Sequence, residues 1–299
     1  MGPVSLPAQN RTRRSASLPP RSLPNPVFFV EIKVMLYLSE SDLRFLVETV
    51  ATNRRDYDHI MNLVRGKEDL MEPMLEDPKL VERLFREEEA LVRISPHLLF
   101  SVLLRRVRMD LEKETYVFEV ESGGKRIPVF EAPAVAELLS DKQICDYLAQ
   151  MLASFVRTNS GVIYWRERGA WHKKRFSDID IDDMMELARI IDPQMRPALY
   201  RRIADLALFL SGIFPDHATR LAARPTTLVS TRRTLKDYEQ QGKRFYRVAE
   251  RETDQEQARP ILATLAEQFI LARRALNSLS DRYLKTYRGQ YFGMPCEAR

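Results

Sequence analysis

Cysteine and histidine are scarce in this chain of 299 residues, which contains two cysteines and four histidines. Cys145 and Cys296 are too few for a disulfide scaffold, and they share no short spacing with each other or with a histidine. This pattern excludes the usual zinc-binding spacings and is typical of a protein with reduced thiols. We therefore expect a cytoplasmic location, and we expect neither a metal nor another cofactor.

Long apolar runs are also missing. The mostly apolar stretch Leu98–Leu104 ends at Arg105, and the run Ile203–Phe214 is interrupted by Asp205. Both are much shorter than the ~20 residues that cross a lipid bilayer as a helix. The sequence therefore predicts a protein without membrane spans.

The short motifs that mark common active sites are absent as well. In Gly123-Gly124-Lys125-Arg126 no Ser or Thr follows the lysine, so these residues predict a hairpin turn and not a phosphate-binding loop. The four histidines lie far apart, without the HxH or HExxH spacing of metal sites, and no serine lies in a nucleophile-elbow context. The sequence therefore does not favour an enzyme.

One acidic cluster has the spacing of a metal-binding motif. Asp182, Asp183 and Glu186 stand at DDxxE spacing, and Asp182 and Glu186 would share one face of a helix. Two such carboxylates could hold Mg²⁺. However, the chain contains no second metal motif, and the acids fall in a first helical turn, where they suit the helix dipole and the cap. We favour the capping role; a magnesium-dependent enzyme remains an alternative.

Charge is unevenly distributed along the chain. The formal net charge is +5, but residues 1–30 carry four arginines and no acid. The remaining 43 Lys and Arg stand against 42 Asp and Glu, so residues 31–299 are nearly neutral. Within them, residues 31–95 are acidic (10 bases, 15 acids) and residues 196–251 are basic (12 bases, 5 acids). Such asymmetry is typical of surfaces that attract partners or each other.

Helical periodicity dominates the sequence. Ser95 and Pro96 are a cap and a first-turn proline for a helix over Ser95–Leu111, which is apolar all round and is therefore predicted to be buried at the centre. Its arginines, including Arg105, would suit the negative end of the helix dipole. A long helix is expected from Ser39 or Ser41 to Gly66.

Two stretches change to the period of a strand. Residues 115–129 and 162–176 each alternate around a glycine-containing turn, which predicts two antiparallel hairpins that could share a sheet. Two long helices near the end, marked by Leu235–Ala249 and Leu262–Tyr283, predict a C-terminal helical hairpin. The fold class is thus mainly α: a multi-helix bundle with a small antiparallel β element and this hairpin.

Three regions follow from these patterns. Residues 1–26, rich in Pro, Arg and Ser, predict a disordered basic tail. Residues 27–223 predict a mainly helical core domain with the β element, and residues 224–299 hold the helical hairpin, either separate or part of the same domain.

The predicted hairpin at 162–176 combines cations with aromatic residues. It has five basic residues against one acid, and it contains both tryptophans of the chain. Cations contact phosphates and rings stack on bases, as in proteins that hold single strands. We favour the simpler alternative, in which the rings pack on the helices and the cations are solvated, because the surrounding region is not basic. The candidate nucleic-acid-binding residues are Trp165, Arg166, Arg168, Trp171, Lys173, Lys174 and Arg175, with Arg232, Arg233 and Lys236 of a basic helix at 232–247.

From the residues alone, we expect a non-enzymatic cytoplasmic protein that acts through a protein partner or through self-association. The long C-terminal helices, whose faces suit helix docking, and the charge asymmetry favour this function. The alternatives are nucleic-acid binding through the basic hairpin and helix, and the magnesium-dependent enzyme.

Overall fold

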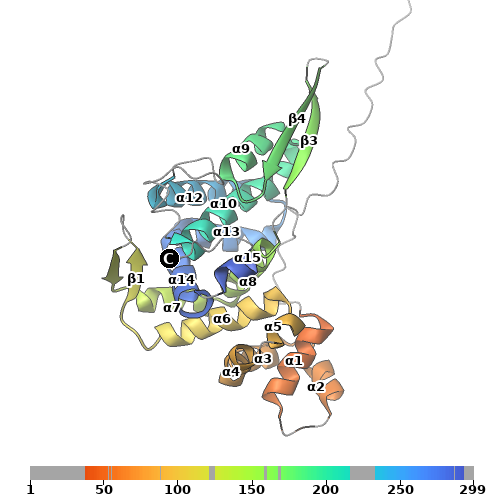
Figure 1. Cartoon of the computed structure of the whole chain (residues 1–299), viewed down its shortest axis with the longest axis vertical. Coiled ribbons are helices and arrows are strands. Elements are labelled where there is room, and N and C mark those ends of the chain that lie inside the picture. The colour runs from red at the N-terminus through yellow and green to blue at the C-terminus, as the bar shows by residue number, and fades with distance from the viewer. Residues whose placement is uncertain are drawn as a thin grey trace, which may run out of the picture.

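The computed structural model describes residues 38–52, 54, 56–87, 89–120, 125–157, 160–167, 170–215, 233–285 and 287–292. The predicted tail at 1–26 and the predicted boundary near residue 224 lie outside these residues. The fold is mainly α with two short antiparallel hairpins, as the sequence predicts (Figure 1). The helices are α1 (Glu40–Val50), α2 (Tyr57–Val64), α3 (Glu68–Leu75), α4 (Pro78–Arg86), α5 (Ala90–Arg93), α6 (Pro96–Leu111), α7 (Ala132–Ser140), α8 (Lys142–Phe155), α9 (Ile181–Ile190), α10 (Arg196–Ile213), α12 (Leu235–Glu252), α13 (Arg259–Glu267), α14 (Phe269–Leu279) and α15 (Arg288–Phe292), with a π-helical turn at Ser280–Leu284. The strands are β1 (Val117–Val120), β2 (Arg126–Val129), β3 (Ser160–Glu167) and β4 (Ala170–Ser177).

Helix α6 lies at the centre, as predicted. The Ser95 hydroxyl accepts a hydrogen bond from the Leu98 N–H at 3.1 Å, and Pro96 is the first helical residue. Asp42, buried at the start of α1, accepts a further bond from the Ser95 N–H at 2.7 Å, which joins the N-termini of α1 and α6. Leucine, valine and phenylalanine side chains are buried all round α6, because α4, α7, α8 and α14 pack against it.

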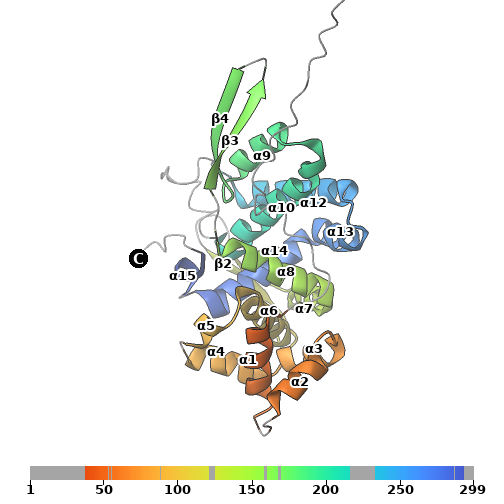
Figure 2. The ribbon, with the colours of Figure 1, turned by 90° about the vertical axis from the view of Figure 1, so that its right-hand side faces the viewer.

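The elements are arranged along one long axis. Helices α1–α5 lie at one end and the β3–β4 hairpin projects at the other (Figures 1 and 2). Between them, α10 packs against α9, α12 and α14, and α6 packs against α7 and α8. The buried apolar side chains form one core that includes Leu38 near the beginning and Phe292 near the end of the described chain.

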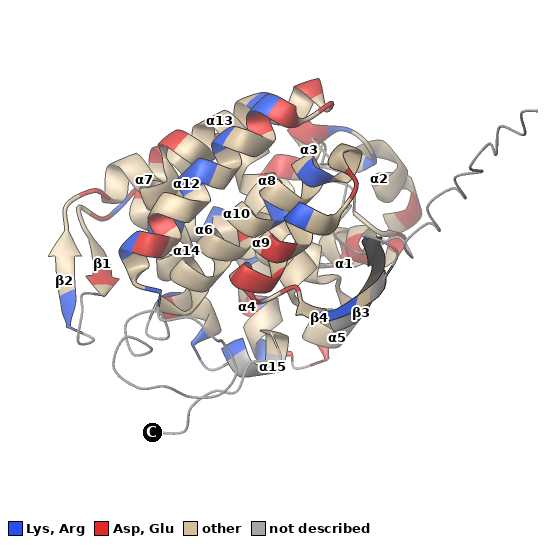
Figure 3. Cartoon of the chain, turned by 90° about the horizontal axis from the view of Figure 1, so that it is seen from above, with Lys and Arg blue, Asp and Glu red and all other residues tan. Residues whose placement is uncertain are grey.

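The two hairpins form separate two-stranded sheets. β1 pairs with β2, and β3 pairs with β4, both antiparallel. They lie on different sides of the molecule (Figures 1 and 3), so the sequence-based option of one shared sheet is not realised. Helix α14 packs against β1, and helix α9 packs against β4.

Two predicted helices are interrupted. The helix expected from Ser39 or Ser41 to Gly66 is split into α1 and α2. Of residues 51–56, which lie between them, only Ala51 is apolar, so this stretch has almost no side chain whose packing on the core would hold a further helical turn. Gly66 has a φ of 72° and does end α2. The last long helix is broken at Gln268, whose φ and ψ of −102° and 27° are not helical. This break lets α13 pack on α8 and α12 while α14 turns toward α6, α7 and α10.

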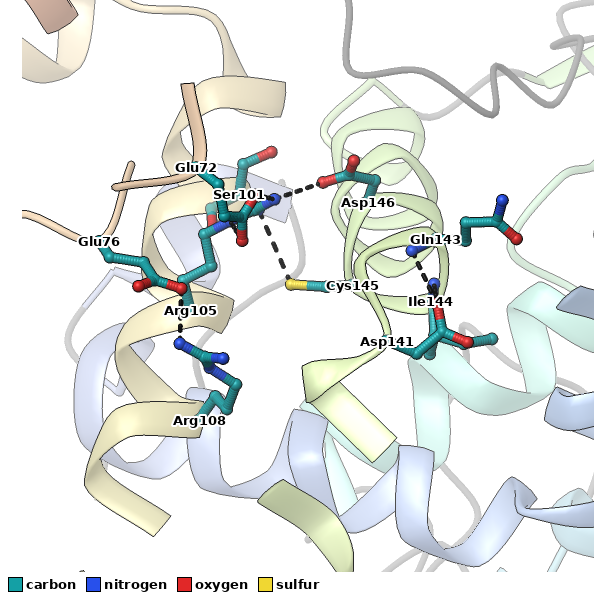
Figure 4. A network of polar contacts seen from close by, with 10 residues as sticks. All are labelled: Glu72, Glu76, Ser101, Arg105, Arg108, Asp141, Gln143, Ile144, Cys145 and Asp146. Atoms are coloured by element: carbon teal, nitrogen blue, oxygen red, sulfur yellow. Dashed lines mark hydrogen bonds and ion pairs between the residues drawn. The ribbon is translucent and has the colours of Figure 1, made fainter. Parts of the chain in front are cut away.

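The position of the Arg105 side chain in α6 differs from the sequence-based prediction. It does not extend toward solvent at the helix terminus; its side chain points into the space between α6, α3 and α8 and is only 2% exposed (Figure 4). Its guanidinium donates to both carboxylate oxygens of Glu72 at 2.8 Å and to Asp146 at 2.9 Å. A further bond reaches the Ser101 carbonyl at 3.2 Å. Arg105 thus joins three helices through buried polar contacts.

No helix in the described parts of the chain is long and apolar enough to cross a membrane.

Candidate interaction surfaces

The β1–β2 hairpin is held against α14 by ion pairs. Glu119 of β1 binds Arg273 and Arg274, and Arg274 also binds Glu131 just after β2. Burial opposes ionisation of Glu119, but Arg273 and Arg274 outweigh it and lower the pKa of this carboxyl. Because strand side chains alternate, Glu119 facing α14 places Phe118 on the opposite side. The hairpin therefore has a fixed inner face and a fixed outer face.

The outer face of this hairpin is aromatic and exposed. Tyr116 and Phe118 are 40% and 46% exposed, Phe130 is 75% exposed, and Pro128 is also exposed. The Tyr116 ring lies edge-on to both phenylalanines, with centroid distances of 5.3 Å to Phe118 and 6.1 Å to Phe130. We call these four residues the aromatic face. Contiguous exposed rings of this kind mark sites where another molecule binds.

Sequence reasoning found the hairpin but missed the aromatic face. Tyr116, Phe118 and Val120 stand at alternate positions, with Glu119 between the last two, which indicates a strand and gives no sign of which side is covered. The signal that could have found it is the pairing of Phe118 with Pro128, because directly opposed residues of an antiparallel pair share a face.

The basic hairpin at 160–177 is split into two unlike faces. The register pairs Val162 with Arg175 and Tyr164 with Lys173, whereas Lys174 pairs with Ile163 on the other face. Of the residues predicted to bind nucleic acid, Lys173, Lys174 and Arg175 are described with their side chains. Arg168 lies outside the described residues, and for Trp165, Arg166 and Trp171 the structure describes the backbone alone.

The acidic cluster is engaged by cations. Asp182 binds Arg233. Lys174 binds Glu186, and its Nζ lies 3.6 Å from Oδ1 of Asp183. Asp183 also accepts a hydrogen bond from the Ser177 N–H at 3.1 Å. The cap of α9 is Asp180, which accepts from the N–H groups of Asp182 and Asp183. Among the residues the structure describes, no group of three His, Cys, Asp or Glu side chains is placed to hold a metal ion.

The predicted basic helix is α12, and it carries a stripe of cations (Figure 3). Arg232 lies outside the described residues, and Arg233 is held by Asp182. Lys236 is exposed; Lys243 follows it after two helical turns, and Arg247 and Arg251 follow at four-residue steps, so these cations share one face. Within the described chain none of them forms an ion pair: Lys236, Lys243, Arg244, Arg247 and Arg251.

A second buried polar cluster lies in α10. Asp205 accepts hydrogen bonds from the Tyr147 hydroxyl at 2.6 Å and from the Tyr246 hydroxyl at 2.8 Å. Burial raises the pKa of Asp205. In the other cluster, beside Arg105, burial raises the pKa of Cys145 to about 12, which makes that thiol a poor nucleophile. These groups hold helices together and do not reach solvent, so they offer no substrate an approach.

Comparison of the chain with protein families, with curated proteins and with solved structures gives no match.

Proposed function

We propose that this is a non-enzymatic cytoplasmic protein that acts by binding a protein partner, and that the partner docks on the aromatic face of the β1–β2 hairpin. The observation that carries the proposal is the exposure of three touching rings, Tyr116, Phe118 and Phe130, on a hairpin held rigidly by α14. Burying rings of this size contributes much of the energy of protein–protein contacts.

The chemistry of the surface defines the partner. The four residues of the face are three rings and a proline, and the charge of Arg126, next along the same side of β2, is paired with Asp281, so the complement of the face is an apolar segment of another polypeptide. The ion pairs of Glu119 and Glu131 lie behind the rings, where they fix the hairpin before a partner arrives. Such preorganisation lowers the entropy cost of binding.

Site-specific photo-crosslinking in the native cells tests the proposal. A benzoylphenylalanine residue replaces Phe130 in one variant and Val92 in the matched control, because Val92 of α5 is 88% exposed but lies far from the aromatic face. We expect one discrete cross-linked product from position 130, none from position 92, and loss of the product when Phe118→Ser is added. The mass of the product distinguishes a different partner from a second copy of the chain.

Two results would overturn the proposal. One is the same set of products from both positions, and the other is no product from position 130. The variant Phe118→Ser must also keep the thermal unfolding of the unmodified protein, because an exposed substitution costs about 0.5 kcal/mol or less.

A further inference from the structure

The β3–β4 hairpin has one face that α9 neutralises. Lys174 of β4 points toward α9 and forms ion pairs with Glu186 and Asp183. Phe176, two residues further along the same face, packs against the core. The positive charge of Lys174 is therefore compensated within the molecule.

The opposite face is open and its charges are not compensated. Tyr164 is 61% exposed and Val162 is 44% exposed, and both of their cross-strand partners, Lys173 and Arg175, are exposed as well. Within the described residues, neither Lys173 nor Arg175 forms an ion pair. Figures 1 and 2 show that the hairpin projects from the end of the molecule, away from the aromatic face.

Strand geometry sets the spacing of these groups. Lys173 and Arg175 are two residues apart on one strand, which separates them by about 6.6 Å. Tyr164 lies directly opposite Lys173, with about 5 Å between the Cα atoms. An exposed ring is thus flanked by one cation beside it and a second on the diagonal.

We propose that this open face binds single-stranded nucleic acid. An unstacked base lies on the ring of Tyr164, and neighbouring phosphates contact Lys173 and Arg175. Rings stack on bases of any identity and cations follow the backbone, so the recognition is not sequence-specific. An acidic protein segment would pair with the two cations but would leave the ring of Tyr164 without a flat group to stack on. In a duplex the bases stack on each other, so none is free to stack on Tyr164. The ring between the cations therefore favours a single strand.

Fluorescence anisotropy with purified protein and a labelled oligothymidylate of about twelve nucleotides tests the proposal over a range of salt concentrations. Lys173→Ala with Arg175→Ala should weaken binding and reduce the slope of log K against log salt by about 1.4, at about 0.7 for each phosphate contact of a single strand. Tyr164→Leu should weaken binding roughly 5- to 150-fold, the contribution of one stacked base, with the salt slope unchanged.

The matched control is Lys174→Ala. It removes the same side chain from the adjacent position, but from the face that α9 covers, so affinity for the oligonucleotide should stay within about twofold. None of the four substitutions introduces proline or glycine, so we expect the fold to stay intact, and far-ultraviolet circular dichroism checks this for the helices.

Any of four results would overturn the inference. The first is that the unmodified protein binds no oligothymidylate, and the second is that Lys174→Ala weakens binding as much as Lys173→Ala with Arg175→Ala does. The third is that a duplex or polyglutamate binds as tightly as the single strand. The fourth is that Lys243→Ala with Arg247→Ala abolishes binding that survives the loss of Lys173 and Arg175. The last result would assign the site to α12.

Discussion

Replacing Arg105 by methionine tests the buried polar contacts at the centre of the fold. Arg105 binds Glu72 through two hydrogen bonds and Asp146 through one, and the side chains of Glu72 and Asp146 are only 19% and 12% exposed. Methionine fills much of the same volume but leaves two buried carboxylates without a cation. Removing one partner of a buried pair costs about 3–5 kcal/mol, and the slight solvent access of both acids places the expected loss at the lower end of this range.

The loss should depend on pH. Burial raises the pKa of Asp146 even though Arg105 opposes this, so removing Arg105 raises it further. In the variant, the folded state then holds a proton on Asp146 at pH values where the unfolded chain has lost it, and the free energy of unfolding falls as pH rises. The difference between the unmodified protein and Arg105→Met should therefore shrink when the pH is lowered from about 7 to about 5.

Urea unfolding followed by far-ultraviolet circular dichroism measures both effects. The control is the triple variant Arg105→Met, Glu72→Gln, Asp146→Asn, which removes the charges together and should recover most of the lost stability. A loss below about 1 kcal/mol for Arg105→Met, a larger loss at acidic pH, or no recovery in the triple variant would refute the reasoning.

Two further substitutions test close packing and a buried carboxylate. Gly242→Ala should destabilise the fold by about 1–3 kcal/mol, because its Cβ would lie 2.1 Å from Cε2 of the buried Phe269; in urea unfolding the double variant with Phe269→Leu should lose less than the sum of the single losses, and additive losses would contradict the contact. Tyr246→Phe should cost about 1.5–3 kcal/mol by removing a donor to Asp205. That cost should decrease at low pH, because the loss of the donor adds to the burial that already raises the pKa of Asp205, and a cost that is independent of pH would contradict this.

Local signals predicted the elements whose ends the sequence itself marks. Ser95 and Pro96 define the start of α6 because a hydroxyl cap and a first-turn proline act within one helical turn. Both hairpins were predicted because alternation and turn residues are also local. The break between α1 and α2 was missed because residues 51–56 are compatible with an exposed helical turn as well as with a loop. Tertiary packing decides between these two.

The role of Arg105 depends on residues that are distant in the sequence. Glu72 lies 33 positions before it and Asp146 lies 41 positions after it, and no local pattern connects them. From its position in the sequence, Arg105 is predicted to lie near the C-terminal end of an apolar helix, where solvated cations are common. The all-apolar surface of α6 was the signal that could have corrected this, because a helix buried on every side leaves a cation no solvent to reach.

Three adjacent cations of β4 lie on two different faces of the strand: Lys173 and Arg175 on one, and Lys174 on the other. As a sequence cluster, the three cations count as one patch of charge. The period of two in a strand already separates Lys174 from the other two, and this step needs no structure. The structure adds the neighbour: α9 presents Asp183 and Glu186 to Lys174, and it leaves Lys173 and Arg175 without an acid. Of these three cations, Lys173 and Arg175 are the two whose charge is not compensated by α9, so any steering of a polyanion by this face of the hairpin comes from them.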